Sequence, residues 1–567
     1  MQAADGPPGP GQINQRLLAL LVALASLTAF TALYVFRSLD DNRLTSWQWA
    51  FEQADIAWLF PALTIALALA YAASGISVPG RWQAPLLFVS SFMAAALLWG
   101  VPEVIVDTAR YFVQAKYLEL YGVGFFMREW GGEIAAWTDL PLVPFLHGLV
   151  FTLFGEARTA VQIFTTLLFS ATGVVTWLIG RTLWDDTVGG SAAALLLAMP
   201  YLLTQSALML VDVPTMFFLA LAVFVTIKAI GDGEVRFLLA APVAITFAML
   251  SKYSTWLMLS VLAVVVLAHL EQDWRTVMKR AVAIGLATIL LAGLLALIKF
   301  DLVVSQMQLL WGYQWPGLAR WEESHVSTFL YQVHPFVTVA ALCSLAIAIA
   351  RRDRRYVIVA WMLLLVVVLG IKRARYVLIT LPMLALMAGY ALREISDGRL
   401  RRFIVACAIA SGLVTAYFGY LPLLNSTSSA NLMAAAERID ALESDRVEVF
   451  TLAQERSIIN PAVLVPILDL YTVKQVLYLQ NPLSPPPWSA LATSPLRFSW
   501  QFDRPSYYGS ATPNAGDAAV VIASRPGQAP PNTIKFIIED MAFVEAFETS
   551  DSIFKFKTLI YLYEPRE

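Results

Sequence analysis

Ionisable side chains stand beside long apolar runs at five separate places in this chain. The acids are Asp107, Asp139 and Asp212, and the bases are Lys252 and the cluster Lys372-Arg373-Ala374-Arg375. A charged residue in or near the hydrocarbon core of a membrane costs about 3 kcal/mol on insertion scales, so it is usually paired or functional. A carboxylate at the mouth of an apolar cavity is suited to be a general base, because burial raises its pKa toward neutral pH. Guanidinium groups bind phosphate oxygens in pairs, so the basic cluster favours a lipid phosphate as its partner.

Each of these residues also has a purely structural interpretation. The Lys252 side chain is long enough to extend to the lipid headgroups. Asp212 comes just before an apolar run, where aspartate is a good helix cap. Asp107 lies three residues before Arg110 and shares a helix face with it, so the two are able to form a simple ion pair. The basic cluster is able to pair with ordinary anionic lipid. The choice depends on whether the chain brings these residues to one face of the membrane.

The elements that position them are transmembrane helices. Of the 567 residues, 58% are hydrophobic and only 14% are charged, whereas soluble domains carry about 25% charged residues. Apolar runs near the roughly 20 residues that cross a bilayer predict about thirteen spans. We expect them at residues 17–36, 57–77, 84–101, 158–181, 187–204, 212–230, 236–250, 254–270, 280–299, 328–350, 356–371, 375–393 and 403–424. The fold class is a mainly α, polytopic transmembrane bundle.

Composition also excludes several classes of protein. The formal net charge is −2 and no basic stripe is present, which disfavours nucleic-acid binding. The two cysteines, Cys343 and Cys407, lie inside apolar runs. That placement excludes a disulfide framework and a structural zinc site.

Basic loops set the orientation of the bundle. A further apolar stretch, Leu140–Gly155, is short and contains Pro141 and Pro144, which favours a re-entrant segment that lines a protein cavity. With that segment re-entrant and the N-terminus inside, the clusters at 351–355, 393–402 and 275–280 all lie on the cytoplasmic side, as loops rich in Lys and Arg do. The five charged places then share the outer face of a plasma (inner) membrane.

The predicted organisation has three parts. Residues 1–16 are expected to form a disordered cytoplasmic N-terminus, 17–424 a transmembrane domain, and 425–567 an extracytoplasmic soluble α/β domain. Within the transmembrane part, 102–157 is the first large outer loop, and the periodicity of 103–121 predicts an amphipathic helix on the membrane surface. In the soluble part, we expect strands at Val447–Leu452, Ala518–Ala523, Ile534–Ile538 and Ile553–Tyr563, and a helix at Ala434–Leu442.

A series of short motifs follows the same order as the spans. The motifs are Asp107-Thr108-Ala109-Arg110-Tyr111, Asp139-Leu140-Pro141-Leu142-Val143-Pro144-Phe145 leading to Leu153-Phe154-Gly155, Arg158 through Arg181-Thr182-Leu183, Asp212, Lys252, and Arg373 with Arg375, Tyr376, Leu378 and Pro382. Their order, spacing and sidedness over 101–424 resemble the integral-membrane glycosyltransferases of the GT-C type. The closest branch holds the protein O-mannosyltransferases and the lipid A aminoarabinose transferases.

The chain departs from that family pattern in three places. Thr108 stands where the family often has a second acid, Asp139-Leu140 replaces an acid-Lys pair, and Tyr253 follows the outer lysine in place of glycine. The first two spans look like an N-terminal addition. Because of these departures, the resemblance identifies neither the acceptor nor whether a divalent metal takes part.

The resemblance implies transfer of a sugar from a polyprenyl-phosphate-linked donor to an acceptor hydroxyl at the outer face, with inversion. It implies Asp107 as the general base. It assigns the acceptor and sugar to Asp139, Asp212, Arg110 and Tyr111, and the donor phosphate to Lys252, Lys372, Arg373 and Arg375. The acceptor is a protein, glycan or lipid, and membrane lipids are further partners.

Aromatic and histidine side chains in the outer loops are further candidates. The tryptophans Trp130, Trp137, Trp311 and Trp315 are suited to stack on sugar rings, although tryptophan at a membrane interface is equally an anchor. His147 and His325 are expected on the same side, but they lack the paired spacing of metal ligands.

Two rival functions fit the same composition. Intramembrane Asp and Lys also mark the substrate path of a transporter, although transporters usually show two similar halves, and no such repeat is visible here. The second rival is a catalytically inactive relative that acts as a binding partner, which the missing second acid leaves open.

Overall fold

The computed structural model describes residues 15–36, 51, 53–271, 273–315, 324–452, 459–479, 488–491, 495–510, 512–514, 516–523, 525–548 and 558–566. Most of the predicted N-terminal disordered segment lies outside these residues. Its last two residues, Gln15 and Arg16, already belong to the first helix.

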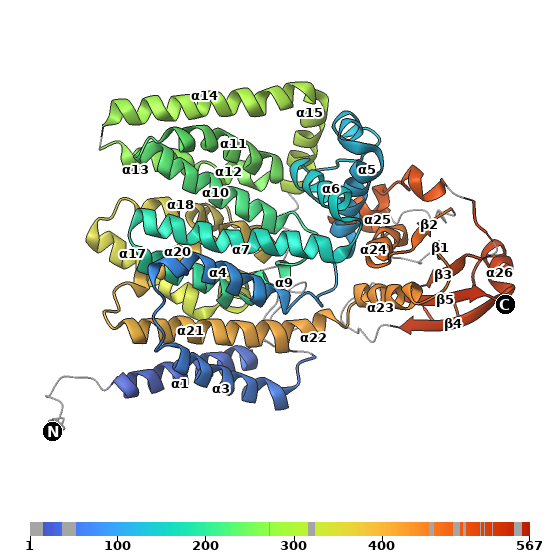
Figure 1. Ribbon diagram of the computed structural model, residues 1–567, viewed down its shortest axis with the longest axis horizontal. Helices are drawn as coiled ribbons and strands as arrows, with labels where there is room; N and C mark the ends of the chain where they lie inside the picture. The colour runs from blue at the N-terminus through green and yellow to red at the C-terminus, as the bar shows by residue number, and fades with distance from the viewer. Residues whose placement is uncertain are drawn as a thin grey trace.

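A bundle of apolar helices forms the larger part of the molecule (Figure 1). Each of the stretches predicted to span a membrane is largely helical. The helices are α1 (Gln15–Phe36), α3 (Ile56–Ala73), α4 (Gly80–Ala96), α7 (Arg158–Leu183), α8 (Asp186–Leu195), α9 (Pro200–Gln205), α10 (Asp212–Gly231), α11 (Val235–Ser251), α12 (Ser254–Met258), α13 (Val261–His269), α14 (Trp274–Ile298), α17 (Pro335–Arg351), α18 (Tyr356–Val368), α19 (Ala374–Val377), α20 (Leu381–Leu392), α21 (Gly398–Val414) and α22 (Leu421–Leu424). Within the described residues, seven helical stretches are long and apolar enough to cross a membrane. The chain is a multi-pass membrane protein, as predicted.

Small residues let the central helices approach closely. A Cβ atom built on Gly180 of α7 would lie 2.6 Å from the Cα of Gly189 on α8, and one on Gly389 of α20 would lie 2.7 Å from the carbonyl oxygen of Val188. Packing of this kind is how transmembrane helices associate where burial from water gives no driving force.

The two ends of the bundle differ. One end carries the C-terminal α/β domain, and we call it the domain end; the opposite end, where α1 begins, is the far end (Figure 1). The basic clusters at 275–280, 351–355 and 393–402 lie at the far end, around the starts of α14, α18 and α21.

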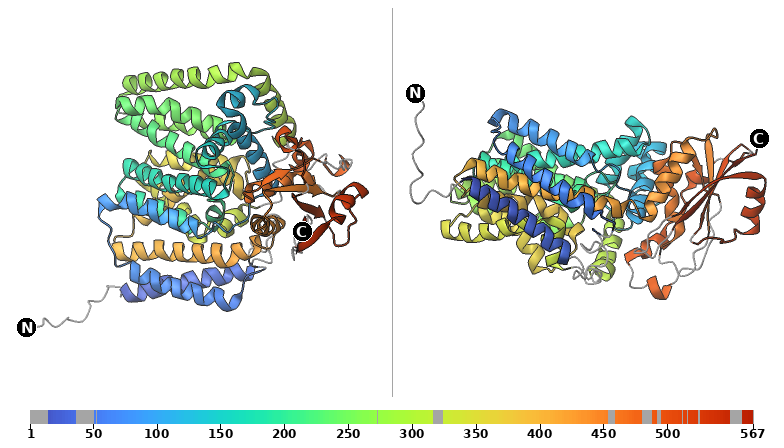
Figure 2. Two further views of the ribbon diagram at one scale, coloured as in Figure 1. Left: turned by 45° about the vertical axis from the view of Figure 1, so that its right-hand side comes forward. Right: turned by 90° about the horizontal axis from the view of Figure 1, so that it is seen from below.

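Two helices of the first large loop lie at the domain end, beside the C-terminal domain (Figures 1 and 2). They are α5 (Ile105–Glu129) and α6 (Leu142–Phe154), which pack against each other. α6 has 13 residues, fewer than the roughly 20 that span a bilayer. The helix α18, in one of the predicted spans, has the same length, so the re-entrant interpretation of 140–155 stays a prediction.

The C-terminal domain contains a mixed five-stranded sheet in the order β2-β1-β3-β5-β4. Its strands are β1 (Arg446–Thr451), β2 (Gln475–Leu477), β3 (Ala518–Ala523), β4 (Met541–Glu548) and β5 (Leu559–Pro565). β1 pairs in parallel with β2 and β3, and β5 pairs antiparallel with β3 and β4. One face, with Val447 and Val449, joins the main core of the bundle, where α23 (Ser428–Asp440) and α24 (Leu464–Tyr471) also contribute. The division of the chain at 424/425 stays a prediction.

The prediction of a strand at Ile534–Ile538 is wrong, because this segment lies in helix α26 (Asn532–Glu539). Ile534 is buried and Phe536 is 73% exposed, and Ile537 and Ile538 pack beside Ile534 against the second face of the sheet. Apolar residues three and four apart are the pattern of a one-sided helix. The strand β4 that follows was not predicted, and residues 553–557 of the last predicted strand lie outside the described residues.

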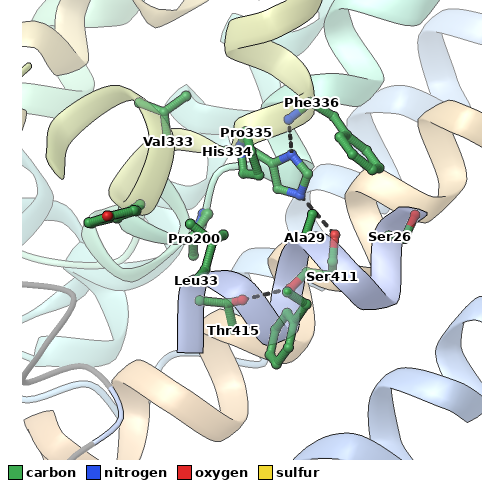
Figure 3. Close-up of a pocket in the computed structure, with 12 residues that line it drawn as sticks. Ser26, Ala29, Leu33, Pro200, Val333, His334, Pro335, Phe336, Ser411 and Thr415 are labelled. Carbon is green, nitrogen blue, oxygen red and sulfur yellow. Dashed lines mark hydrogen bonds between the residues drawn. The ribbon is translucent and has the colours of Figure 1, made fainter. Parts of the chain in front are cut away.

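The N-terminal helices α1 and α3 pack against α21, and a small cavity of about 20 Å³ lies between α1, α21 and the start of α17 (Figure 3). His334 lies there: its Nδ1 accepts a hydrogen bond from the Phe336 amide at 3.1 Å, and its Nε2 lies 2.8 Å from the Ser411 hydroxyl. A ring nitrogen that accepts a hydrogen bond from a backbone N–H carries no proton of its own. The ring is therefore neutral, and its Nε2 donates a hydrogen bond to the Ser411 hydroxyl. The cavity has room for about one water molecule.

Candidate active site

The first turn of α5 carries the carboxylate around which the site is built. Asp107 lies in that turn, where the partial positive charge of a helix N-terminus favours an acid. One turn later, Arg110 Nη2 lies 3.0 Å from Asp107 Oδ1. The predicted sharing of a helix face by these two residues is therefore observed.

Arg375 on α19 joins this pair to a second acid. Its Nη1 forms an ion pair with Asp107 Oδ2, and its Nε lies 2.8 Å from Oδ2 of Asp212 at the start of α10. The other oxygen of Asp212 accepts a hydrogen bond of 2.5 Å from Lys252 Nζ, which lies between α11 and α12. Four separate stretches of chain thus meet through alternating acids and bases.

Asp139 extends the arrangement on the other side of Arg110. Arg110 Nη2 lies 3.2 Å from Asp139 Oδ1, and Gln114 Nε2 donates to Asp139 Oδ2 at 3.2 Å. Gln306, on α15 (Phe300–Leu309), donates to the backbone oxygen of Asp139 at 3.0 Å and accepts from the Tyr253 hydroxyl. We call the six charged residues in order, Asp139, Arg110, Asp107, Arg375, Asp212 and Lys252, the ion-pair chain.

The members of the ion-pair chain differ in burial. The Asp212 side chain is 1% exposed and that of Asp139 is 7% exposed, whereas Asp107 is 24% exposed. Removing a carboxylate from water is costly unless it is paired, and the three bases here supply that pairing. Asp107 is the acid that solvent, or an acceptor, reaches most readily.

The pKa of Asp107 is lower than the sequence suggests. Burial acts to raise it, but the positive charges of Arg375 and Arg110 hold the pKa of this carboxyl well below its usual range. The expectation that burial brings this pKa toward neutrality is therefore wrong for the free protein, because the sequence did not show two guanidinium groups on one carboxylate. Burial does raise the pKa of Asp139, which Arg110 offsets only in part.

The remaining predicted site residues lie around the ion-pair chain. The ring of Tyr376 lies 5.4 Å from Lys252 Nζ and 5.3 Å from the guanidinium carbon of Arg373. Lys372 is exposed, and its backbone oxygen accepts a hydrogen bond from Thr328. The Tyr111 hydroxyl lies 3.5 Å from Arg110 Nη2. Of the predicted phosphate ligands, Lys252 and Arg373 therefore lie beside Tyr376, whereas Arg375 is engaged by the two acids.

The aromatic candidates divide into two groups. Trp130 is buried, whereas the ring of Trp137 lies 5.6 Å from the guanidinium carbon of Arg110. Trp311 and Trp315 are exposed, and their ring centroids lie 5.8 Å apart. Among these, Trp137 is next to the ion-pair chain.

The described residues contain no group of three or more His, Cys, Asp or Glu side chains that is placed to hold a metal ion. His147 is fully buried, and neither ring nitrogen has a hydrogen-bond partner within these residues. Its ring instead packs edge-on against Phe164.

Two features of the site were not predicted from the sequence. Gln114 and Gln306 hold Asp139 in place, and no motif marks either of them. Tyr253 was noted only as a departure from the family pattern, and the structure shows its hydroxyl on Gln306.

A second charged group, the Lys116 cluster, joins the middle of α5 to the C-terminal domain. It consists of Lys116, Glu119, Glu156 and Asp469. Lys116 Nζ lies 3.0 Å from Glu156 Oε1 and 2.7 Å from Asp469 Oδ2, and the hydroxyl of Tyr508 donates to Asp469 at 2.7 Å. Burial and the neighbouring carboxylate of Asp469 raise the pKa of Glu156 to about 9, and burial also raises the pKa of Glu119.

A further contact ties the C-terminal domain to Glu103, two residues before α5. The backbone amide of Glu103 donates to the hydroxyl of Tyr471 at 2.7 Å, and the Glu103 carboxylate lies 3.2 Å from Arg158 Nε. The same carboxylate accepts hydrogen bonds from the Thr108 hydroxyl and the Met209 amide. The start of α5 is thereby fixed from three directions.

Comparison with known proteins agrees with this architecture. Residues 139–298 match a family model described as dolichyl-phosphate-mannose-protein mannosyltransferase. ArnT from Cupriavidus metallidurans bound to undecaprenyl phosphate superimposes with a TM-score of 0.55 at 13% identity, covering 86% of this chain and 98% of that chain. Its apo state gives a TM-score of 0.50 at 13% identity, covering 84% and 97%. AglB from Archaeoglobus fulgidus, in complex with an inhibitory peptide and a dolichol-phosphate, gives 0.45 at 12% identity, covering 70% and 65%. Among curated proteins, none matches the chain.

The fold and the site define a polytopic membrane protein with the architecture of the GT-C type glycosyltransferases. Within that type, the chain resembles the branch of the protein O-mannosyltransferases and the lipid A aminoarabinose transferases, as the motifs predict. The family model includes Asp139, Asp212 and Lys252, whereas Asp107 and Arg375 lie outside the matched residues.

Proposed function

We propose that this chain is a membrane glycosyltransferase that moves a sugar from a polyprenyl-phosphate-linked donor to an acceptor hydroxyl, with inversion. The observation that carries the proposal is the ion-pair chain, which gathers three carboxylates, Lys252 and Arg375 at the domain end of an apolar bundle. Acids suited to hydroxyl groups and bases suited to a phosphate are both needed for this reaction, and here they are in direct contact.

The donor phosphate is assigned to Lys252 and Arg375, with Arg373 and Lys372 beside them. A phosphate is an anion, so it competes with Asp107 and Asp212 for the cations that these acids hold in the free protein. The lipid tail lies between helices. As the bond from the sugar to phosphate breaks, preorganised cations in a water-poor site stabilise the charge that develops on the leaving group.

Asp107 is the proposed general base. While Arg375 is paired with it, this carboxylate is a weak base, because its pKa is lowered. When the donor phosphate takes Arg375, Asp107 loses part of that stabilisation and its proton affinity rises. It then accepts the proton of the acceptor hydroxyl as the hydroxyl oxygen attacks the anomeric carbon, and the electrons of the breaking bond leave with the phosphate.

The other acids and their neighbours orient the substrates. Asp139 and Asp212 accept hydrogen bonds from acceptor or sugar hydroxyls, and Arg110 and Tyr111 contribute to the same binding site. Arg110 also holds Asp139 and Asp107 at a fixed separation through its two ion pairs.

Sidedness follows from the basic loops. The clusters at 275–280, 351–355 and 393–402 lie at the far end of the bundle, and short basic loops stay cytoplasmic. The domain end, with the site and residues 425–567, is therefore assigned to the outer face of the plasma membrane. The acceptor class is a protein, glycan or lipid, in line with the branch that the chain resembles.

The test is Asp107→Asn, with Asp301→Asn as its matched control. Asp301 is an exposed acid on α15, so its loss leaves the ion-pair chain intact. The full chain in nanodiscs is given labelled polyprenyl-phosphate donors that carry mannose or aminoarabinose, and both donor binding and sugar transfer are measured. We expect Asp107→Asn to bind donor and to lose transfer by about a hundredfold or more, and Asp301→Asn to behave as the native chain.

Two outcomes of that test would overturn the proposal. Full transfer by Asp107→Asn rules out this residue as the base. A native chain that binds the donors and transfers no sugar to any acceptor class is instead the inactive relative considered above.

A further inference from the structure

An apolar groove of about 400 Å³ lies between α1, α3 and α21. It is remote from the ion-pair chain, because it begins at Arg16 in the first turn of α1, at the far end of the bundle. Ala19 and Ala23 of α1 and Ala68 of α3 contribute small side chains to its wall. Small residues on both helices leave an open space where larger side chains would close it.

The length of the groove matches one leaflet of a bilayer. Along α1 it extends from Arg16 to Leu27, which at a rise of about 1.5 Å per residue is about 16 Å. The hydrocarbon core of a bilayer is about 30 Å thick, so one leaflet is about 15 Å deep. The groove therefore runs from the level of the headgroups to about the middle of the membrane.

The volume of the groove limits the size of the ligand that it can bind. A transmembrane helix is about 10 Å across and about 30 Å long, so it needs several times the space. A single hydrocarbon chain fits. The first 14 residues of this chain, MQAADGPPGPGQIN, contain no apolar run, so they are poorly suited to a groove lined by Leu24, Leu27 and Leu67.

Positive charge surrounds the mouth of the groove. Arg16 lines it at the start of α1, and the guanidinium carbon of Arg399 lies 5.1 Å from the ring of Tyr71, another lining residue. Arg402 lies beside them and donates to the backbone oxygen of Ser74, just after α3. The turn between α20 and α21 has two acids. Asp397 accepts hydrogen bonds from the amides of Arg399 and Leu400 as the cap of α21, and Glu394 lies 2.6 Å from Arg351 Nη2.

We propose that this groove binds one anionic phospholipid, with an acyl chain between α1 and α3 and a phosphate headgroup held by Arg16 and Arg399. Basic side chains at the cytoplasmic ends of transmembrane helices are suited to anionic headgroups, and the apolar wall accounts for the acyl chain. The lipid holds the N-terminal helices against α21. The site differs in place and in ligand from the proposed donor site at the domain end.

The test is native mass spectrometry of the full chain in detergent, with phosphatidylglycerol or phosphatidylcholine of identical acyl chains added. We expect one phosphatidylglycerol to bind, roughly tenfold tighter than phosphatidylcholine. The double variant Arg16→Ala/Arg399→Ala is expected to lose that preference. Its matched control is Arg236→Ala/Arg275→Ala, two exposed arginines at the far end on α11 and α14, and it should keep the preference.

A second pair of variants tests the acyl chain separately. Ala23→Leu/Ala68→Leu fills the groove without changing charge and is expected to abolish the bound lipid of either kind, whereas Ala283→Leu on exposed α14 should not. Equal binding of the two lipids by the native chain overturns the proposal, as does an equal loss in the control arginine variant. A dimer mass that appears as lipid is removed would instead assign the groove to a second copy of the chain.

Discussion

Arg375 forms an ion pair with Asp107, a residue 268 positions earlier in the chain. The same guanidinium also holds Asp212 at 2.8 Å. A planar guanidinium offers several donors in fixed directions, so one arginine is able to serve two carboxylates at once. In the proposed reaction, this arginine is shared between the resting acids and the incoming phosphate.

Arg375→Lys is predicted to reduce sugar transfer by about a hundredfold, although it keeps the charge. A lysine ammonium is a single point charge on a flexible stem, and it cannot hold Asp107 and Asp212 in their present separation. The measurement is transfer from labelled donor by the purified full chain. Arg236→Lys, at an exposed position outside the ion-pair chain, is the control and should retain native activity. Native activity of Arg375→Lys would show that the bridging geometry is unimportant.

The pH dependence of transfer is predicted to differ between kcat and kcat/KM. In the free protein, the lowered pKa of Asp107 keeps the carboxylate ionised well below neutral pH, so the acid limb of kcat/KM that belongs to this group lies below about pH 4. In the donor complex, the phosphate takes Arg375, so the acid limb of kcat should lie at higher pH. Profiles measured at saturating and at low donor concentration distinguish the two. Coincident limbs would contradict the sharing of Arg375 between Asp107 and the phosphate.

The lowered pKa of Asp107 also makes the free energy of unfolding depend on pH. A carboxyl whose pKa is lower in the folded state stabilises that state at pH values above its unfolded pKa, and this stabilisation is lost as the pH falls toward the folded value. The ion pair of Asp107 with Arg375 is therefore expected to stay intact from neutral pH down to about pH 4.

Glu156→Gln is predicted to raise the melting temperature near pH 8 by roughly 2 °C or more. The pKa of Glu156 is raised from 4.5 to about 9, because burial and the neighbouring carboxylate of Asp469 outweigh the opposing charge of Lys116. Between these values the folded protein binds more protons than the unfolded chain, so the free energy of unfolding falls as the pH rises. Glutamine mimics the protonated form and removes that loss.

The control for this variant is its behaviour at pH 5, where Glu156 is protonated in the folded state and the two proteins should melt more nearly together. Asp469→Asn is expected to lower the melting temperature, because Asp469 forms an ion pair with Lys116 and accepts a hydrogen bond from the Tyr508 hydroxyl. Thermal unfolding in detergent, followed by tryptophan fluorescence, measures each. A Glu156→Gln protein less stable than native at pH 8 would contradict the raised pKa.

Gly412→Ala is predicted to destabilise the bundle. A Cβ atom at this position of α21 would lie 2.2 Å from the backbone oxygen of Ala198, which cannot move like the end of a side chain. The matched control is Gly285→Ala on α14, where nothing lies within 4 Å of the added atom. The yield of monodisperse protein and its melting temperature should fall only for the first. Equal values for both variants would show that the helices separate at little cost.

The helices could be predicted from the sequence because a membrane span is a long, local signal. Each depends on a run of apolar residues within about 20 positions, and the structure shows helix in every predicted run. The prediction of a strand at Ile534–Ile538 failed because a short segment with four apolar residues around Lys535 fits a strand or a helix equally well. Only the packing of Ile534 against the sheet decides between them.

The candidate site could be predicted only in part. Charge inside apolar sequence identified Asp107, Asp139, Asp212, Lys252 and Arg375. In the structure, Arg110 links Asp139 to Asp107, and Arg375 links Asp107 to Asp212, which also contacts Lys252. The distances between them depend on tertiary contacts, so the lowered pKa of Asp107 was missed. Gln114 and Gln306 were also missed, because a neutral polar residue in a loop or on a helix surface carries no signal until its partner is known.

The contacts of α24 with α5 limit what can be engineered in this protein. Tyr471 and Asp469 hold Glu103, two residues before α5, and the fourth turn of that helix, and Asp107 lies between these two points. A chimaera that keeps the bundle but takes its C-terminal domain from a relative must therefore reproduce both contacts, since they fix the first turns of the helix that carries Asp107.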